Sequence, residues 1–268
     1  MQEQLIRKVS RVGNGAHIFV PKEWINENIL LVRTIKQNIE EKILEILNPY
    51  LENISAVFLY GSYARNEQTP DSDIDILVIS NKKFKVEKSQ EWEINVIDNR
   101  IKDAIKINPI LIYSILSEAK PIINSQLLKE LKEKYQPKLK DFKDFLKETE
   151  LAIKTNEEFL NLEKEEYTNN DAVAYSLILR LKGIYIINTL LAKKKYSKKD
   201  FEKWIKEKAN VKDYESIFNA YLSVKKETEK KLKMRVYDLI LLLKLLEKET
   251  MKLEEKHDKK KKTSRKRH

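Results

Sequence analysis

Two aspartates, Asp73 and Asp75, stand at the start of an apolar run that ends at Ser80. Alternate residues of a β-strand face the same side, so both carboxylates are expected to project from one face of a strand 73–80. Two acids aimed at one point repel each other unless a cation lies between them, and carboxylate oxygens suit the hard cations Mg²⁺ and Mn²⁺. The spacing therefore predicts a divalent metal site.

A second group of residues lies where the apolar stretch VFLYGS, residues 57–62, ends in a glycine turn. Gly61 lets a backbone approach a phosphate closely, and amide groups at a helix start can bind phosphate oxygens together with the Ser62 hydroxyl. Arg65, about one turn further on, adds a charged contact. Together with the acid pair, this turn predicts a site for a metal-bound nucleoside triphosphate.

The stretch GSYARNEQTPDSDID resembles the nucleotidyltransferase superfamily that includes DNA polymerase beta, and within it the small prokaryotic "minimal" nucleotidyltransferases. The resemblance covers about residues 36–125. It implies a mixed β-sheet flanked by helices, with Asp73 and Asp75 as metal ligands and with the Gly-Ser turn and Arg65 holding the phosphates. It also implies transfer of a nucleoside monophosphate, AMP from ATP in our interpretation, with release of pyrophosphate.

Active members of that family normally supply a third carboxylate from a later strand, as a metal ligand or as the base for the attacking hydroxyl. Here that strand is WEINVI, residues 92–97, and alternation places Glu93 and Asn95 on one face. We expect Glu93 to be the third acid and metal ligand. Asn95 is the alternative occupant of this position, and because a neutral amide cannot act as a base, that arrangement would leave a weak or inactive site. Asp98 is interpreted as a turn residue.

The composition excludes several classes of chemistry and concentrates the charge. The 268 residues include no cysteine and 3 histidines, which excludes disulfides, thiolate nucleophiles and sulfur-bound zinc. The longest apolar run, 239–243, is too short for a membrane span and no secretory signal opens the chain, so we expect a cytoplasmic protein. Residues 256–268 carry +7 of the net charge of +11, which predicts a disordered basic tail that aids solubility or attracts RNA or DNA.

The N-terminal residues 1–35 predict a small β unit, because apolar-alternating stretches flank Gly13-Asn14-Gly15, a hairpin signal. The run VSRVGNGAHIFVPKEWI resembles the AbrB-like swapped-hairpin domains. That resemblance implies a homodimer, and DNA contacts from the basic residues Arg7, Lys8, Arg11 and Lys22. Dimerisation is the inference on which we rely more.

Residues 138–255 contain no proline and a single glycine, which predicts a bundle of long amphipathic helices such as 172–191 and 237–256. The bundle loosely resembles the HEPN-type domains that accompany nucleotidyltransferases. It lacks the Arg and His pair that HEPN ribonucleases need, because no histidine occurs between His17 and His257. Arg180 and Lys182 are candidates for orienting an acceptor.

The sequence thus predicts an α+β protein with a small N-terminal β unit (1–35), a nucleotidyltransferase domain (36–137), an all-α bundle (138–255) and a basic tail (256–268). The expected function is Mg²⁺-dependent nucleotide transfer to a hydroxyl of a partner protein, of RNA or of a small molecule. A partner protein comes first, with the chain as the antitoxin-type member of a toxin–antitoxin pair. The alternative is a non-catalytic, dimeric DNA-binding regulator, or a protein that masks a partner, with a degenerate nucleotidyltransferase domain.

Overall fold

The structure is a computed structural model that describes residues 10–29, 39–70, 72–87, 89, 91–228 and 232–265, with side chains described as far as Lys256. The chain divides into two compact units, Met1–Ile46 and Leu47–His268. Parts of the predicted N-terminal β unit, including Arg7 and Lys8, lie outside the described residues.

The first unit contains the predicted hairpin. Strands β1 (Ser10–Val12) and β2 (Gly15–His17) pair antiparallel, with Val12 opposite Gly15. Gly13 has φ +53°, a conformation that glycine adopts at little cost. A short 3₁₀ turn η1 (Lys22–Trp24) follows, and the next described element is α1 (Ile39–Leu47).

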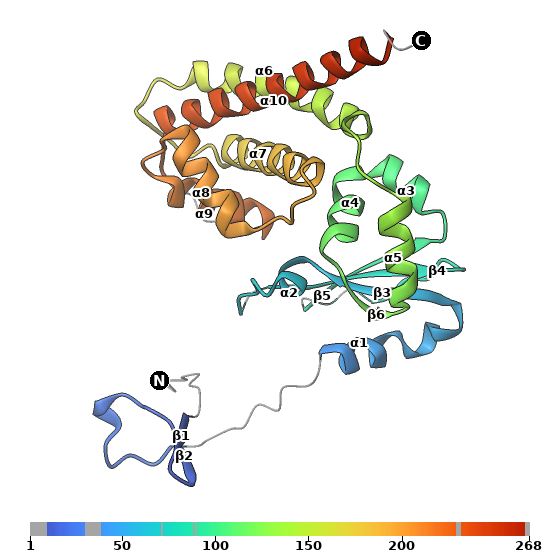
Figure 1. Cartoon of the computed structure of the whole chain (residues 1–268). Coiled ribbons are helices and arrows are strands. Elements are labelled where there is room, and N and C mark those ends of the chain that lie inside the picture. The colour runs from blue at the N-terminus through green and yellow to red at the C-terminus, as the bar shows by residue number, and fades with distance from the viewer. Residues whose placement is uncertain are drawn as a thin grey trace. The chain divides into compact units, whose positions relative to one another are not determined.

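Four strands of the second unit form one mixed sheet in the order β5-β4-β3-β6 (Figure 1). Its strands are β3 (Ile54–Tyr60), β4 (Ile74–Ser80), β5 (Trp92–Asp98) and β6 (Lys120–Ile123). β3 is antiparallel to both of its neighbours, whereas β4 and β5 are parallel and are joined by residues 81–91. The runs 57–62, 73–80 and 92–97 correspond to β3, β4 and β5, with bounds that differ by at most three residues, and Gly61 and Ser62 begin α2 instead of continuing the strand.

The remaining elements of the second unit are helices and short strands. Before the bundle come the following elements: η2 (Asn48–Asn53), α2 (Gly61–Arg65), α3 (Ile101–Ile107), α4 (Pro109–Glu118) and α5 (Ser125–Lys134). The bundle consists of the following elements: η3 (Leu139–Phe142), α6 (Lys143–Leu162), β7 (Tyr167–Thr168), α7 (Asp171–Leu191), α8 (Lys198–Ala209), α9 (Tyr214–Lys225), β8 (Met234–Arg235) and α10 (Val236–Arg265).

Polar side chains begin several of these helices, because the first backbone N–H groups of a helix need acceptors from outside it. Asn124 accepts a hydrogen bond from the amide of Leu127 at the start of α5, and Asp213 accepts one from Ser216 at the start of α9. Ser197 does the same for Asp200 at the start of α8.

The sheet and the bundle share one hydrophobic core. Helices α3, α4 and α5 cover one face of the sheet, and α4 packs against α7 of the bundle (Figure 1). The buried cluster is continuous from Phe58 and Leu77 in the strands to Leu177 and Leu242 in the bundle. The segments 36–137 and 138–255, which the sequence treats as separate domains, are therefore packed together in the part of each that falls within Leu47–His268.

Helix α7 is the centre of the bundle. Among the described helices it alone is long and apolar enough to cross a membrane by length and composition. Leu177, Ile178 and Leu181 are fully buried inside the protein, and a helix that is apolar on all sides is expected to be a core helix.

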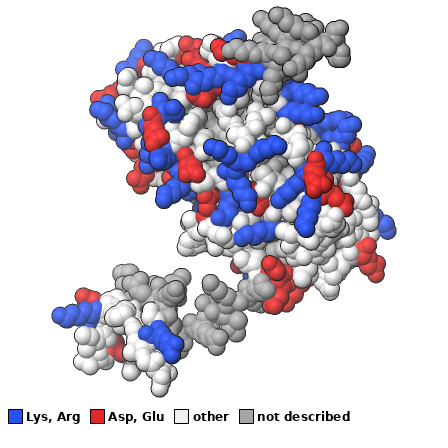
Figure 2. Space-filling model, in the orientation of Figure 1, with Lys and Arg blue, Asp and Glu red and all other residues white. Residues whose placement is uncertain are grey.

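The C-terminal basic segment differs from the prediction. Helix α10 continues to Arg265, so most of 256–268 is helical rather than disordered. Lysine, arginine and glutamate are good helix formers, and a helix that has already begun is extended at little cost. Figure 2 also shows Lys and Arg side chains spread over the visible face of the second unit, with acidic residues between them.

Candidate active site

The carboxylate of Asp75 lies against the backbone of Gly61. Gly61 follows the last residue of β3 and has φ +71°, and a Cβ placed on it would lie 2.7 Å from the Asp75 Cγ and would overlap the carboxylate oxygen. The close approach is possible because Tyr60 is paired with Asp75 across the β3–β4 ladder. Glycine is therefore required here both by the backbone angle and by the space that the carboxylate fills.

The register of the parallel strands brings Glu93 beside Asp75. These two residues are partners in the β4–β5 ladder, whereas Asn95 is paired with Leu77, one step further along the strand. The Asn95 amide donates to the Glu93 carboxylate at 3.3 Å and to the Tyr60 hydroxyl at 2.9 Å. Of the two candidates for the third acidic position, Glu93 is therefore the one level with Asp75. Asn95 supports Glu93 by a hydrogen bond.

Asp73 lies just before β4 and is exposed, as is Glu93, whereas Asp75 is half-buried. The pKa of the Asp75 carboxyl is raised to about 7, chiefly by burial and also by the negative charges of Glu93 and Asp73, while Lys225 and Arg65 oppose the shift. Burial, with the charges of Asp75 and Glu93, also raises the pKa of the Tyr60 hydroxyl, which stays protonated. The three predicted acids are therefore near enough to interact.

These acids fit a divalent cation in their chemistry. All of the donors are carboxylate oxygens, and a cation beside Asp75 would remove the repulsion that raises its pKa. Among the residues that the structure describes, however, no group of three histidine, aspartate or glutamate side chains is gathered closely enough to form a finished ligand set. The side chains of Asp73 and Glu93 would have to turn towards Asp75 when an ion binds.

The predicted phosphate-binding residues form the short helix α2. Ser62 is its second residue and is half-buried, and Arg65 is its last. The Gly61 amide donates to Glu118 Oε1 at 3.0 Å, and Arg65 donates to the same oxygen at 2.6 Å and to Glu67 at 2.9 Å. The Gly61 amide and two nitrogens of Arg65 are therefore bound by carboxylates within the protein.

Two lysines of the bundle face this site, and sequence reasoning missed the role of Lys225. The pKa of Lys182 on α7 is lowered to about 8, chiefly by burial and also by the positive charges of Lys225 of α9 and Arg65, while Asp75 and Glu118 oppose this shift. Lys225 in turn opposes the raised pKa of Asp75. No motif identifies these lysines, because their positions depend on how α7 and α9 pack beside the sheet.

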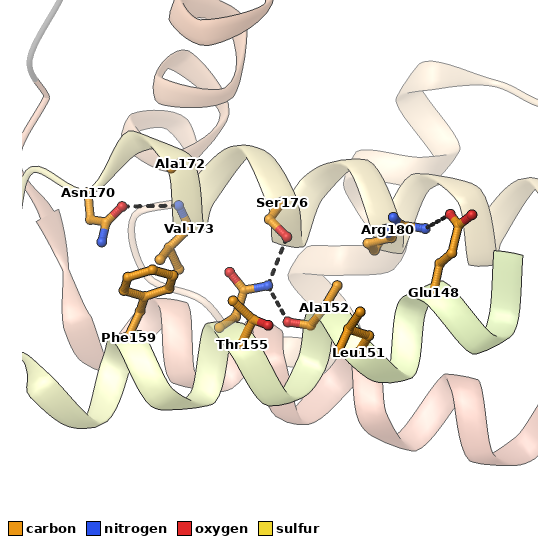
Figure 3. Close-up of a pocket in the computed structure, with 11 residues that line it drawn as sticks. Glu148, Leu151, Ala152, Thr155, Phe159, Asn170, Ala172, Val173, Ser176 and Arg180 are labelled. Atoms are coloured by element: carbon orange, nitrogen blue, oxygen red, sulfur yellow. Dashed lines mark hydrogen bonds and ion pairs between the residues drawn. The ribbon is translucent and has the colours of Figure 1, made fainter.

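Arg180, which the sequence groups with Lys182, belongs to a different place. It lies in a groove of about 520 Å³ between α6 and α7, where it pairs with Glu148 at 3.2 Å (Figure 3). Its guanidinium also lies 5.1 Å from the ring centroid of Phe145. Two residues along a helix place side chains on different sides, so Arg180 and Lys182 do not form one face.

A family model matches the part of the chain that contains these residues. Residues 41–135 match the family model described as "Polymerase beta, Nucleotidyltransferase". This stretch is a polymerase beta-type nucleotidyltransferase domain, which confirms the class of enzyme and the α+β fold that the sequence predicts. It contains all six residues predicted for the site, together with Glu67 and Glu118.

Two solved structures resemble the chain at low identity. One is the spectinomycin adenyltransferase AAD(9) from Enterococcus faecialis, with 14% identity, a TM-score of 0.43, and coverage of 79% of this chain and 97% of that one. The other is a nucleotidyltransferase-like protein from Exiguobacterium sibiricum, with 13% identity, a TM-score of 0.37, and coverage of 80% and 75%. No curated protein matches the chain.

Proposed function

We propose that the protein is a Mg²⁺-dependent nucleotidyltransferase that transfers AMP from ATP to a hydroxyl group. The observation that carries this proposal is the position of Asp75, which lies against Gly61 and level with Glu93. A carboxylate buried beside other acids is an unfavourable arrangement for stability alone. It is the arrangement expected where a cation and a triphosphate bind.

In this proposal Asp73, Asp75 and Glu93 hold Mg²⁺, or Mn²⁺ in its place. The bound ion would supply charge neutralisation on the triphosphate and would lower the pKa of the attacking hydroxyl. Glu93, the more exposed partner of Asp75, accepts the proton of that hydroxyl. Ser62, with the backbone of the Gly61 turn, orients the phosphates for attack in line with the leaving pyrophosphate.

The bundle supplies the positive charge on the other side of the triphosphate. Lys182 and Lys225 lie near each other and near Asp75, and their mutual repulsion contributes to the lowered pKa of Lys182. A bound triphosphate would reverse this effect, because a nearby anion favours the protonated form of a lysine. We therefore assign the phosphate contacts chiefly to these two lysines.

For the acceptor we propose the hydroxyl of a partner protein, with the chain as the antitoxin-type member of a toxin–antitoxin pair. RNA and a small molecule are the alternatives. In all three acceptors a hydroxyl group would attack the α-phosphate, so the reaction itself does not distinguish them. The molecule that becomes labelled from ATP identifies which acceptor is used.

The test is to incubate the protein with Mg²⁺, cell extract and ATP labelled on the α-phosphate. Asp75→Asn and Asp73→Asn are expected to lose at least about a hundredfold in labelling, because each removes one charge from the metal site. Asp98→Asn is the matched control, since Asp98 lies on β5 but binds Arg100 at 2.6 Å. Equal labelling by the wild type and both site variants would contradict the proposal.

One observation favours a second function. Among the described residues the acids do not form a finished ligand set, as would be the case in a degenerate site of a dimeric DNA-binding regulator. Arg11 and Lys22, two of the basic residues predicted to contact DNA, lie in the described part of the first unit. Tight binding of duplex DNA that is lost with residues 1–35, together with no uptake of ATP and Mg²⁺ in calorimetry, would support this second function.

A further inference from the structure

We propose that Glu67 and Glu118 are positioning residues that hold Arg65 between α2, α4 and α8. In this arrangement Arg65 fixes the wall of the bundle that carries Lys182, instead of contacting the triphosphate. The inference rests on the proposed function. It changes the role that the sequence suggests for Arg65, and it gives a role to Glu67 and Glu118, to which the sequence analysis assigns none.

Glu118 ties both ends of α2 to the end of α4. Its side chain is only 4% exposed, and one oxygen, Oε1, accepts from the Gly61 amide at 3.0 Å and from Arg65 at 2.6 Å. A buried carboxylate requires such partners, since an unpaired charge in the interior is strongly destabilising. The turn that contains Gly61 and Ser62 is therefore held by the same group that holds Arg65.

Glu67 ties Arg65 to the start of α8. Its carboxylate accepts from Arg65 Nε at 2.9 Å and from the Lys198 amide at 3.2 Å. Burial alone would raise the pKa of Glu67, but hydrogen bonds from Arg65, from the Ser197 side chain and from Lys198 outweigh burial and lower this pKa. A carboxylate at the start of a twelve-residue helix also interacts favourably with the helix dipole.

Arg65 completes this connection through its flat face. The guanidinium carbon lies 5.1 Å from the ring centroid of Tyr196, and the Lys182 ammonium lies 5.7 Å from the same centroid. Tyr196 is buried, so its ring is a fixed contact between α2 and α7. Two nitrogens of Arg65 are bound by carboxylates and the face of its guanidinium lies against Tyr196. Arg65 therefore connects α2 with α4 and the bundle.

The consequence is a contact chain from α4 through α2 to the bundle. Glu118 binds Arg65, Arg65 binds Glu67, and Glu67 binds the amide of Lys198. The bundle lysine that faces Asp75 is placed by this chain through Tyr196. A substitution of Glu67 is therefore expected to impair the alignment of bound ATP for the reaction and to leave most of the binding energy of ATP unchanged.

The experiment compares Glu67→Gln, Arg65→Lys and their double variant with the wild type. Each single variant keeps a similar volume, but glutamine has one acceptor oxygen and lysine one donor nitrogen, so neither can keep both hydrogen bonds of the residue it replaces. We expect each to lower kcat about tenfold while the Kd for ATP with Mg²⁺ changes less than about threefold. Because the two residues act as one unit, the double variant is expected to be no worse than either single variant. Arg180→Lys, whose ion pair lies in the α6–α7 groove, is the matched control.

Amide hydrogen exchange separates this inference from the proposed function. The Lys198 amide is expected to exchange faster in Glu67→Gln and in Arg65→Lys than in the wild type, whether or not transfer is measured. The positioning role would be overturned if the Lys198 amide exchanged at the wild-type rate in both variants. It would also be overturned if Arg65→Lys bound ATP about tenfold more weakly while Glu67→Gln kept the wild-type kcat and Kd. No ATP binding by the wild type would overturn the proposed function instead, and the exchange rates alone would then decide whether Glu67 holds α8.

Discussion

The contact between Gly61 and Asp75 is the smallest unit on which the site depends. A side chain of any size at position 61 would displace the carboxylate that we assign to the metal site. The Gly-Ser turn and the Asp-x-Asp pair could be predicted from sequence because both are local: one needs a positive φ and the other needs alternation along a strand.

The partners of Arg65 could not be predicted in the same way. Glu118 lies 53 residues away along the chain, and it meets Arg65 only because α4 ends beside α2. A glutamate at the end of a helix has no signature that distinguishes it from a solvated surface residue. For the same reason the proximity of Lys225 to Asp75 could not be predicted from the sequence, because it depends on how α9 packs.

Gly61→Ala is expected to destabilise the fold and abolish ATP binding. The methyl group would overlap the Asp75 carboxylate, and an alanine at positive φ adds about 1 kcal/mol of strain. Thermal unfolding and calorimetry with ATP and Mg²⁺ measure the two effects. Gly15→Ala is the control, because its Cβ would meet only the Val12 oxygen, at an ordinary 3.8 Å. Normal ATP binding by Gly61→Ala would contradict the placement of Asp75.

Asp75→Asn is expected to stabilise the protein without metal at high pH. The folded state holds the Asp75 proton more tightly than the unfolded state, with a pKa of about 7 against 3.8. The stability that this proton contributes is complete below about pH 4 and is lost as the pH rises to about 7. Asparagine carries no charge, so the gain is on the order of 4 kcal/mol well above pH 7 and vanishes near pH 4.

The measurement for Asp75→Asn is the melting temperature in EDTA between pH 4 and pH 8, compared with the wild type. Asp98→Asn removes a carboxylate on the neighbouring strand that is paired with Arg100, and it is expected to show no such gain at high pH. A difference between Asp75→Asn and the wild type that stays constant across this range would argue against a raised pKa.

At the scale of elements, the strand register decides which acid completes the site. Alternation along residues 92–97 correctly places Glu93 and Asn95 on one face, but it cannot say which of them is level with Asp75. The parallel ladder supplies that information by pairing Glu93 with Asp75 and Asn95 with Leu77. Alternation of side chains was sufficient to predict which face of the sheet the two residues share. Their position along the strand relative to Asp75 could be determined only from the structure.

The helices were predicted well in their interiors and less well at their ends. The pattern 172–191 becomes α7 (Asp171–Leu191), and 237–256 becomes the start of α10. The prediction of a disordered segment at the end of α10 was wrong. It was based on the fact that a run of charged residues cannot form a core. Helix propensity and continuation from a packed helix decide that segment instead.

Glu93→Gln is expected to lower kcat by at least about a hundredfold, because an amide cannot accept the proton of the attacking hydroxyl, and to weaken binding of ATP with Mg²⁺ less, because Asp73 and Asp75 remain as metal ligands. Asn95→Ala removes only the amide that supports Glu93 and is expected to cost about tenfold or less. Labelling rates and ATP titrations of both variants check this. A larger loss of kcat in Asn95→Ala than in Glu93→Gln would identify Asn95 as the residue at the third position.

At the scale of the whole molecule, the chain consists of two compact units. The predicted hairpin is present in the first unit, and its two strands are too small to form a stable core alone. Pairing with a second copy is the solution that the AbrB-like resemblance suggests. The homodimer and its contacts with DNA stay predictions, as does the HEPN-like interpretation of the bundle.

Deletion of residues 1–35 is expected to convert a dimer into a monomer while leaving ATP binding within about twofold of the full chain, since the site lies within Leu47–His268. Light scattering after size-exclusion chromatography measures the mass, and calorimetry measures the binding. A dimer that persists in the shortened chain would place the self-association in the second unit.

The parallel pairing of β4 and β5 also sets a limit on the chain between them. Each strand has seven residues, so a return from the end of β4 to the start of β5 must span about 23 Å at ~3.3 Å per residue. Residues 81–91 provide eleven residues for this path, which is near the shortest length that joins two parallel neighbours. Insertions there should be tolerated, whereas loss of three or four residues would draw Glu93 out of step with Asp75 and inactivate the enzyme without touching any residue of its site.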